Sequence, residues 1–157
     1  MKKQLELDDS TARRLYATAS AEFKTMLEEN FGKDFFTEKI TDRVRDYRDI
    51  LNISGVKATD DEIKVVGFDD EENAVVSNLI RKMRTVKVYN EGYKFKRGDK
   101  RHYPYYNVSS GFVFSCTTYV STHAGTTSAP RLAFKDDTLC RDYAKKFEHI
   151  EKGIIEF

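Results

Sequence analysis

The chain has 157 residues, and its 27 lysines and arginines nearly balance 26 aspartates and glutamates, giving a formal net charge of +1. Aromatic residues make up 13% of the chain, which argues against intrinsic disorder, and no apolar run approaches the ~18 residues of a membrane span. The length predicts a single domain, 1–157, with a helical half 1–92 and a sheet-plus-helix half 93–157. The first residues lack the apolar core of a signal peptide, so we expect a soluble protein made in a cytoplasm.

Three helical patterns occupy the first 55 residues. Asp8, Asp9 or Ser10 can cap a helix that continues to about residue 19, and Ser20 can cap a second helix that ends at Gly32. A third helix is expected to start at Thr41 or Asp42 and end at Gly55, with a buried stripe of Val44, Tyr47, Ile50 and Leu51. Residues 56–70 are acidic and lack a clear period, so residues 63–66 can be either a short strand or part of a loop.

The longest predicted helix begins at Asp69 or Asp70 and stops near Gly92. Its apolar residues recur with a 3.6-residue period over about four turns. Its first turn is acidic and its last turns are basic, an arrangement that complements the helix dipole.

The pattern then changes to a period of two residues. A strand over 112–121 is expected to bury its even-numbered face, which includes Phe114 and Cys116. A preceding strand, 103–108, can pair with it, and Pro104 belongs at an edge or at the strand start because it lacks an N–H. Residues 131–134 are predicted to form a third short strand.

A last helix is expected after the strands, capped by Asp136 or Asp137. Its predicted buried stripe consists of Leu139, Tyr143, Phe147, Ile150 and Ile154. The order of elements predicts an α+β fold, with N-terminal helices, a small antiparallel three-stranded sheet and a C-terminal helix packed on that sheet. Cys116 and Cys140 lie in apolar patterns, and both are expected to be buried, reduced thiols.

Charge is unevenly distributed along the chain. Residues 1–80 carry 12 basic and 18 acidic side chains, whereas residues 81–101 carry nine basic and two acidic ones, which gives this short segment a net charge of +7. Aromatic residues interleave with the basic segment, so the pattern predicts a partner-binding or nucleic-acid-binding surface at 81–106. Its candidate residues are Lys94, Lys96, Arg97, Lys100, Arg101, Tyr103 and Tyr105.

Two other interpretations of the basic segment remain open. It can be the solvated end of a helix and a hairpin loop, with half-buried strand tyrosines, or it can dock onto the acidic half of the same chain. Arg131 and Lys135 form a weaker candidate, an anion pocket beside the N-terminus of the last helix. Asp136 and Asp137 argue against that pocket because they occupy the same helix end.

Catalytic patterns are missing from the sequence. The three histidines have no metal-ligand spacing, and no phosphate-binding loop or dinucleotide fingerprint is present. We therefore expect no cofactor, no metal and no enzymatic activity, although a hydrolase whose residues converge only in the fold remains an alternative.

Several ordered motifs carry a resemblance to known sequences. They are residues 15–24 (LYATASAEFK), 31–36 (FGKDFF), 39–44 (KITDRV), 103–106 (YPYY), 110–115 (SGFVFS), 131–135 (RLAFK) and 143–147 (YAKKF). Together these motifs resemble small uncharacterised proteins encoded by phages and prophages of gut Bacteroidetes. The resemblance implies a viral or prophage origin and a place in the cytoplasm of the bacterial host or in a virion, and it supplies no activity.

The sequence as a whole predicts a non-enzymatic, phage-encoded binding protein that acts on a host or virion protein. The alternative is a nucleic-acid binding module that uses the basic and aromatic residues of 81–106. No membrane partner is expected, and the oligomeric state is left open.

Overall fold

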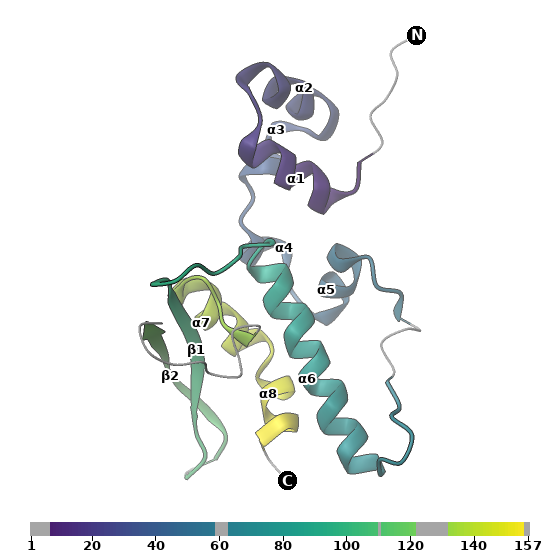
Figure 1. Ribbon diagram of the computed structural model, residues 1–157, viewed down its shortest axis with the longest axis vertical. Coiled ribbons are helices and arrows are strands. Elements are labelled where there is room, and N and C mark those ends of the chain that lie inside the picture. Colours follow the sequence, from purple (N-terminus) through teal and green to yellow (C-terminus); the bar gives the residue numbers. More distant parts are fainter. Residues whose placement is uncertain (1–6, 59–62, 110, 122–131, 156–157) are drawn as a thin grey trace.

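The computed structural model describes residues 7–58, 63–109, 111–121 and 132–155. Figure 1 shows helix α6 as the spine of the main body, with α5 on one side, α7, α8 and the strands on the other, and α1 to α3 at one end of the molecule. The mixture of helices and strands confirms the α+β class, and the single domain 1–157 stays a prediction. The elements are α1 (Asp9–Thr18), α2 (Ala21–Phe31), α3 (Lys33–Thr37), α4 (Ile40–Arg43), α5 (Tyr47–Ser54), α6 (Asp70–Tyr89), β1 (Lys100–Asn107), β2 (Val113–Ser121), α7 (Asp137–Lys146) and α8 (Glu148–Ile155).

The first two helices begin and end where their capping residues predict. Asp8 accepts a hydrogen bond from the Thr11 N–H, and Ser20 accepts one from the Phe23 N–H. Helix α2 ends at Gly32, whose φ of +85° suits a residue without a Cβ. An additional short helix, α3, follows at once and brings Phe36 against Tyr16, with ring centroids 4.1 Å apart. These helices therefore form a small aromatic cluster of their own.

The predicted third helix is two helices, and its predicted start at Thr41 or Asp42 is wrong. Helix α4 ends at Arg43, the next residue Val44 has an extended backbone, and Asp46 caps the start of α5. The Asp46 carboxylate accepts hydrogen bonds from the N–H groups of Arg48 and Asp49, so it offers a better cap than any residue further back. Gly55 ends α5 in the left-handed conformation, as expected. The described residues 63–69 form a loop and not a strand.

Helix α6 organises the main core. It starts with a capping box in which Asp69 and Glu72 satisfy each other's backbone N–H groups, which confirms the predicted start. Its last two turns are buried between α5 and the C-terminal helices. The core that surrounds them consists of Ile40, Val44, Ile50, Val86, Val88, Tyr89, Phe134, Leu139, Cys140, Tyr143, Phe147 and Ile150.

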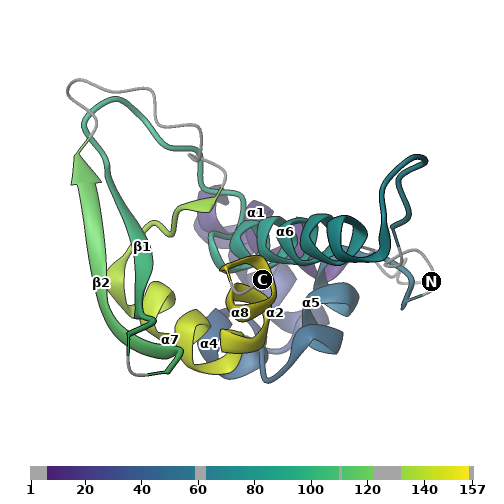
Figure 2. The ribbon, with the colours of Figure 1, turned by 90° about the horizontal axis from the view of Figure 1, so that it is seen from below.

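The predicted last helix is interrupted at Phe147, whose φ of −122° and ψ of 26° end α7 before α8 begins. Asp136 caps α7, as expected, and the predicted stripe is buried from Leu139 to Ile150. The interruption gives the two helices different neighbours, because α7 packs on both strands while α8 packs on α6. Figure 2 shows the strands on one side of the molecule, with α7 next to them.

The sheet has two antiparallel strands, so the prediction of a third strand at residues 131–134 is wrong. Phe134 exchanges two hydrogen bonds with His102, of 3.0 and 2.9 Å, but forms only this isolated bridge. In an antiparallel ladder the next residue of β1 to face this segment is Pro104, which has no N–H to donate. In the other direction, the chain enters α7 immediately after Asp136. Arg131 lies outside the described residues.

A bulge in β2 changes which side chains are buried. Tyr105 pairs with Cys116 while its neighbour Tyr106 pairs with Phe114, so Ser115 is an extra residue. Because side chains alternate between faces, one extra residue moves Cys116 to the face opposite Phe114. Phe114 packs with Tyr106 against α7, but Cys116 is exposed, so the expectation of a buried Cys116 is wrong. Cys140 is buried, as expected.

Asn90, which ends α6, ties the segment 133–135 to the helix. Its buried side-chain amide donates to the Ala133 carbonyl at 2.8 Å and accepts from the Lys135 N–H at 2.9 Å. These two bonds satisfy the backbone groups on the side of Phe134 that faces away from β1. Asn90 therefore fixes the bridge to His102 and the start of α7 relative to α6.

Replacing Asn90 by Ala should lower the free energy of unfolding by about 2–4 kcal/mol, because two backbone groups at a buried site lose their partners. Urea denaturation monitored by circular dichroism measures this loss. Asn52→Ala is the matched control, since Asn52 is exposed on α5 and its removal should change stability by less than about 0.5 kcal/mol. Equal effects of the two substitutions would contradict the proposed role of Asn90.

Two buried tyrosines provide a second test of the core. The Tyr143 hydroxyl donates to Glu151, which is 2% exposed and also lies 2.7 Å from Lys82 Nζ. The Tyr106 hydroxyl is buried, and the described residues offer it no hydrogen-bond partner. Tyr143→Phe should therefore cost about 1.5–3 kcal/mol in urea denaturation, while Tyr106→Phe should be neutral or stabilising. The reverse order would show that Tyr106, and not Tyr143, belongs to the polar network.

Candidate binding surface

The turn between α6 and β1 is well ordered by its own hydrogen bonds. One carboxylate oxygen of Asp99 accepts from the Tyr93 hydroxyl at 2.8 Å and from the Lys96 N–H at 2.6 Å. These bonds hold the pKa of Asp99 below its usual value. The Tyr93 ring stands edge-on to Phe95 at 5.4 Å, and the Arg101 guanidinium lies over the other end of this pair, 5.1 Å from the Phe95 ring centre.

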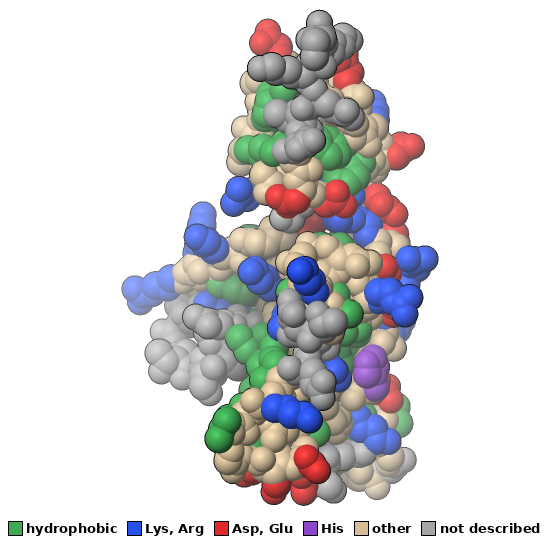
Figure 3. Space-filling view, turned by 90° about the vertical axis from the view of Figure 1, so that its right-hand side faces the viewer, with side chains coloured by type: hydrophobic (Ala, Val, Ile, Leu, Met, Phe, Trp, Pro, Cys, Tyr) green, Lys and Arg blue, Asp and Glu red, His purple; other side chains and the backbone are tan. Residues whose placement is uncertain are grey.

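This turn presents three basic side chains to solvent. Lys94, Lys96 and Arg97 are exposed, and none of them forms an ion pair with a carboxylate of the described residues. Lys100 is exposed where β1 begins. Figure 3 shows Lys and Arg side chains gathered across the middle of one face, with carboxylates above and below them. We call Lys94, Lys96, Arg97 and Lys100, with Tyr93 and Phe95, the basic turn.

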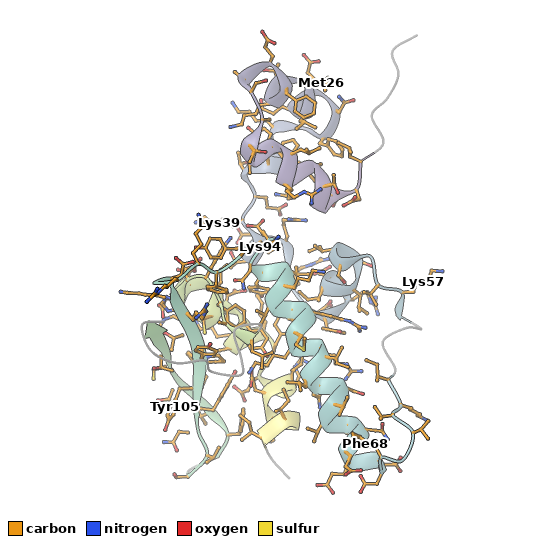
Figure 4. The ribbon with its side chains drawn as sticks, viewed as in Figure 1. Met26, Lys39, Lys57, Phe68, Lys94 and Tyr105 are labelled. Carbon is orange, nitrogen blue, oxygen red and sulfur yellow. The ribbon has the colours of Figure 1, made fainter. Side chains whose placement is uncertain are left out.

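The basic turn does not dock on the acidic residues that begin α6. Those residues, Asp69 to Glu72, lie at the opposite end of a 20-residue helix, which is roughly 30 Å long at about 1.5 Å per residue. Figure 4 shows this separation, with Phe68 beside one end of α6 and Lys94 near the other. Lys82 is different, because it is nearly buried against Glu151 and belongs to the core.

The outer face of the two strands continues the surface. One side of β1 faces away from α7 and carries Arg101, Tyr103 and Tyr105. Across the ladder, Tyr103 pairs with Thr118 and Tyr105 pairs with Cys116. Tyr105 is 59% exposed, while Tyr103 and Arg101 are half-buried. The structure therefore places Lys94, Lys96, Arg97 and Lys100 on the exposed turn and at the strand start, and brings Arg101, Tyr103 and Tyr105 together on one side of β1. We call the outward side of both strands the ribbon face.

Sequence reasoning missed two members of the ribbon face, Cys116 and Thr118. Alternation alone places them with Phe114, and only the bulge at Ser115 moves them outward. A serine in a strand carries no signal for a bulge, so no feature of the sequence could have identified them.

The candidate anion pocket is reported only in part by the structure. Lys135 Nζ lies 3.4 Å from Glu91, and Asp136 accepts from the Leu139 N–H at the start of α7. The Lys135 ammonium group and an N–H group at the start of α7 thus already have acidic partners within the protein. Arg131 lies outside the described residues, and the pocket stays a prediction.

The rest of the described chain offers little chemistry for a cofactor or metal. No group of three His, Cys, Asp or Glu side chains among the described residues can hold a metal ion. An open cleft beside α5 contains both signs of charge, with the Arg45 guanidinium paired to Asp49 at 3.1 Å. Its lining residues are Asp9, Glu38, Asp42, Arg43, Arg45, Asp49, Asn52 and Ile53.

Comparisons of the chain with protein-family models, with curated proteins and with solved structures find no match. Of the helices in the described part of the chain, none has both the length and the apolar character needed to cross a membrane.

The two cysteines should react very differently with thiol reagents. Burial raises the pKa of Cys140 to about 12, which leaves almost no thiolate to react, while Cys116 is exposed on the ribbon face. Ellman's reagent at pH 8 should therefore modify one thiol in the native protein and both in urea. Cys116→Ser should abolish the native reaction, and rapid modification of this variant would show that Cys140 is accessible.

Proposed function

We propose that the protein is a non-enzymatic binding protein that engages an acidic partner through the basic turn and the ribbon face. The observation that carries the proposal is the set of three exposed cations, Lys94, Lys96 and Arg97, for which the described residues supply no ion-pair partner. The resemblance to phage and prophage proteins supports a partner in the bacterial host or in the virion. A protein partner with an acidic surface is the first candidate.

The fixed conformation of the basic turn supports a role in binding a partner, beyond the effect of its charges on the solubility of the protein. Asp99 and the packed side chains of Tyr93, Phe95 and Arg101 hold the backbone of the basic turn in place before any partner arrives. A surface that is already ordered loses less conformational entropy on binding, so more of the contact energy appears as affinity. Clustered positive charge also speeds the encounter with an acidic partner, in a manner that depends on salt.

Nucleic acid is the second candidate, and Tyr105 favours it. This side chain is 59% exposed in the middle of a strand and shares the ribbon face with Tyr103 and Arg101. Exposed aromatic rings beside cations can stack unpaired bases while the cations hold phosphates. Stacking of this kind contributes about 1–3 kcal/mol per base.

The triple variant Lys94→Ser, Lys96→Ser, Arg97→Ser tests the surface. It should fold normally, because exposed charges contribute little to stability, and it should lose most of its affinity for polyglutamate and for oligo-dT at low salt. Fluorescence anisotropy with each labelled polymer measures the loss. The control is Lys33→Ser, Arg48→Ser, Lys57→Ser, which removes the same charge from exposed sites on α3, at the start of α5 and just after it. Equal affinities of the two triple variants would overturn the proposal.

Tyr105→Ala separates the two kinds of partner. If bases stack on the ribbon face, the variant should bind oligo-dT about 5- to 150-fold more weakly, the equivalent of about 1–3 kcal/mol. Its affinity for polyglutamate should not change, because polyglutamate has no rings to stack. An unchanged affinity for both polymers would favour a protein partner over nucleic acid. Protection of Cys116 from Ellman's reagent by the bound polymer would show independently that the ribbon face is covered.

A further inference from the structure

The loop that precedes α6 displays apolar side chains at its tip. Val65 to Phe68 form a tight turn in which the Phe68 N–H donates to the Val65 carbonyl at 3.2 Å, and Gly67 has the positive φ that this turn requires. Val66 is fully exposed, and Phe68 is 44% exposed. We call residues 65–68 the apolar tip.

Helix α6 holds the apolar tip in place through Asn73. The Asn73 side chain accepts from the Val65 N–H at 2.7 Å and donates to the carbonyls of Phe68 and Asp69 at 3.1 and 2.8 Å. Four residues further along the helix, the Ser77 hydroxyl donates to the Ile63 carbonyl. The exposed valine and phenylalanine are therefore presented by a fastened turn, and burying them against a partner would cost little ordering.

Negative charge lies beside the apolar tip on the side of α6, and the exposed Lys64 directly precedes the tip. Asp70 and Glu71 are exposed in the first turn of α6, and their neighbours Asp69 and Glu72 form the capping box. A partner surface for this tip should combine an apolar or aromatic contact with basic side chains around it, because like charges would repel it and an uncharged rim would leave its carboxylates without partners.

The basic turn of the same protein has this combination. Tyr93 is 44% exposed beside Phe95, and the exposed Lys94, Lys96 and Arg97 belong to the same turn. The apolar tip and its carboxylates at the start of α6 therefore complement the aromatic rings and cations that follow the end of the helix. The helix keeps the ends roughly 30 Å apart, so the two surfaces of one chain cannot meet.

We propose that the apolar tip of one copy docks on the basic turn of a second copy, head to tail. Two different surfaces take part, so in a pair each copy still has one surface unused. Further copies can bind to these surfaces, and the assembly extends into a chain or closes into a ring. The proposal rests on the same basic turn as the proposed function, and an acidic partner should therefore compete with self-association.

Sedimentation velocity at rising protein concentration and low salt tests the proposal. The wild-type protein should shift from monomers to larger species, and high salt should reverse the shift. The tip variant Val66→Ser, Phe68→Ser and the turn variant Lys94→Ser, Lys96→Ser, Arg97→Ser should each remain monomeric. A 1:1 mixture of the two variants should stop at dimers, because it contains one intact tip and one intact turn per pair.

The control is Met26→Ser, Val108→Ser, which removes two exposed apolar side chains outside both surfaces and should associate like the wild type. A wild-type protein that stays monomeric, or a tip variant that still associates, would overturn the inference. The tip variant should keep wild-type affinity for polyglutamate. If the turn variant loses polyglutamate binding and the wild type is monomeric, the self-association inference fails and the proposed function stands. If the turn variant keeps polyglutamate binding but no longer associates, the proposed function fails and the inference stands.

Discussion

The position of the strands relative to the helical core depends on the amide of Asn90. This side chain ends α6 and takes the place of a neighbouring strand for residues 133–135, because it both donates to and accepts from their backbone. Phe134 is thereby held in the core while its own backbone pairs with His102. The start of β1 is therefore held in two ways: the chain reaches it from α6 through the basic turn, and Phe134 pairs with His102. Because Asn90 ends α6 and also holds the segment around Phe134, this one buried side chain aligns the candidate surface with the rest of the molecule.

The helices were predictable where a single residue decides the local structure. Ser20, Asp69 and Asp136 cap helices as expected, since a side-chain acceptor at that position satisfies an N–H group that nothing else can reach. The prediction failed where two local solutions compete. Asp46 binds two N–H groups and so divides one predicted helix into two, and Phe147 interrupts another whose apolar spacing continues without a break.

The strands were harder to predict because their faces and edges depend on the partner. The period of two residues indicated both strands, but the bulge at Ser115 exists only in the pairing and reverses the face of Cys116. Pro104 was expected at an edge of the sheet. That it prevents residues 131–134 from forming a third strand could be predicted only by knowing that Phe134 lies along the same edge. The basic and aromatic residues of the candidate surface could nevertheless be named from the sequence, since charge and aromatic content are properties of the sequence itself, whereas Cys116 and Thr118 could not.

A formal net charge of +1 conceals unlike charges at the two ends of α6, and the length of this helix keeps them apart. Carboxylates at the start of α6 and Lys87 in its last turn stabilise the helix through its dipole, whereas the cations of the basic turn lie beyond the last turn and add further positive charge at that end. The length of α6, whose last two turns are buried, keeps its two ends from neutralising each other. Whatever binds the basic turn meets a positive field that the acidic end, roughly 30 Å away and beyond the ~8 Å Debye length at physiological salt, does little to weaken.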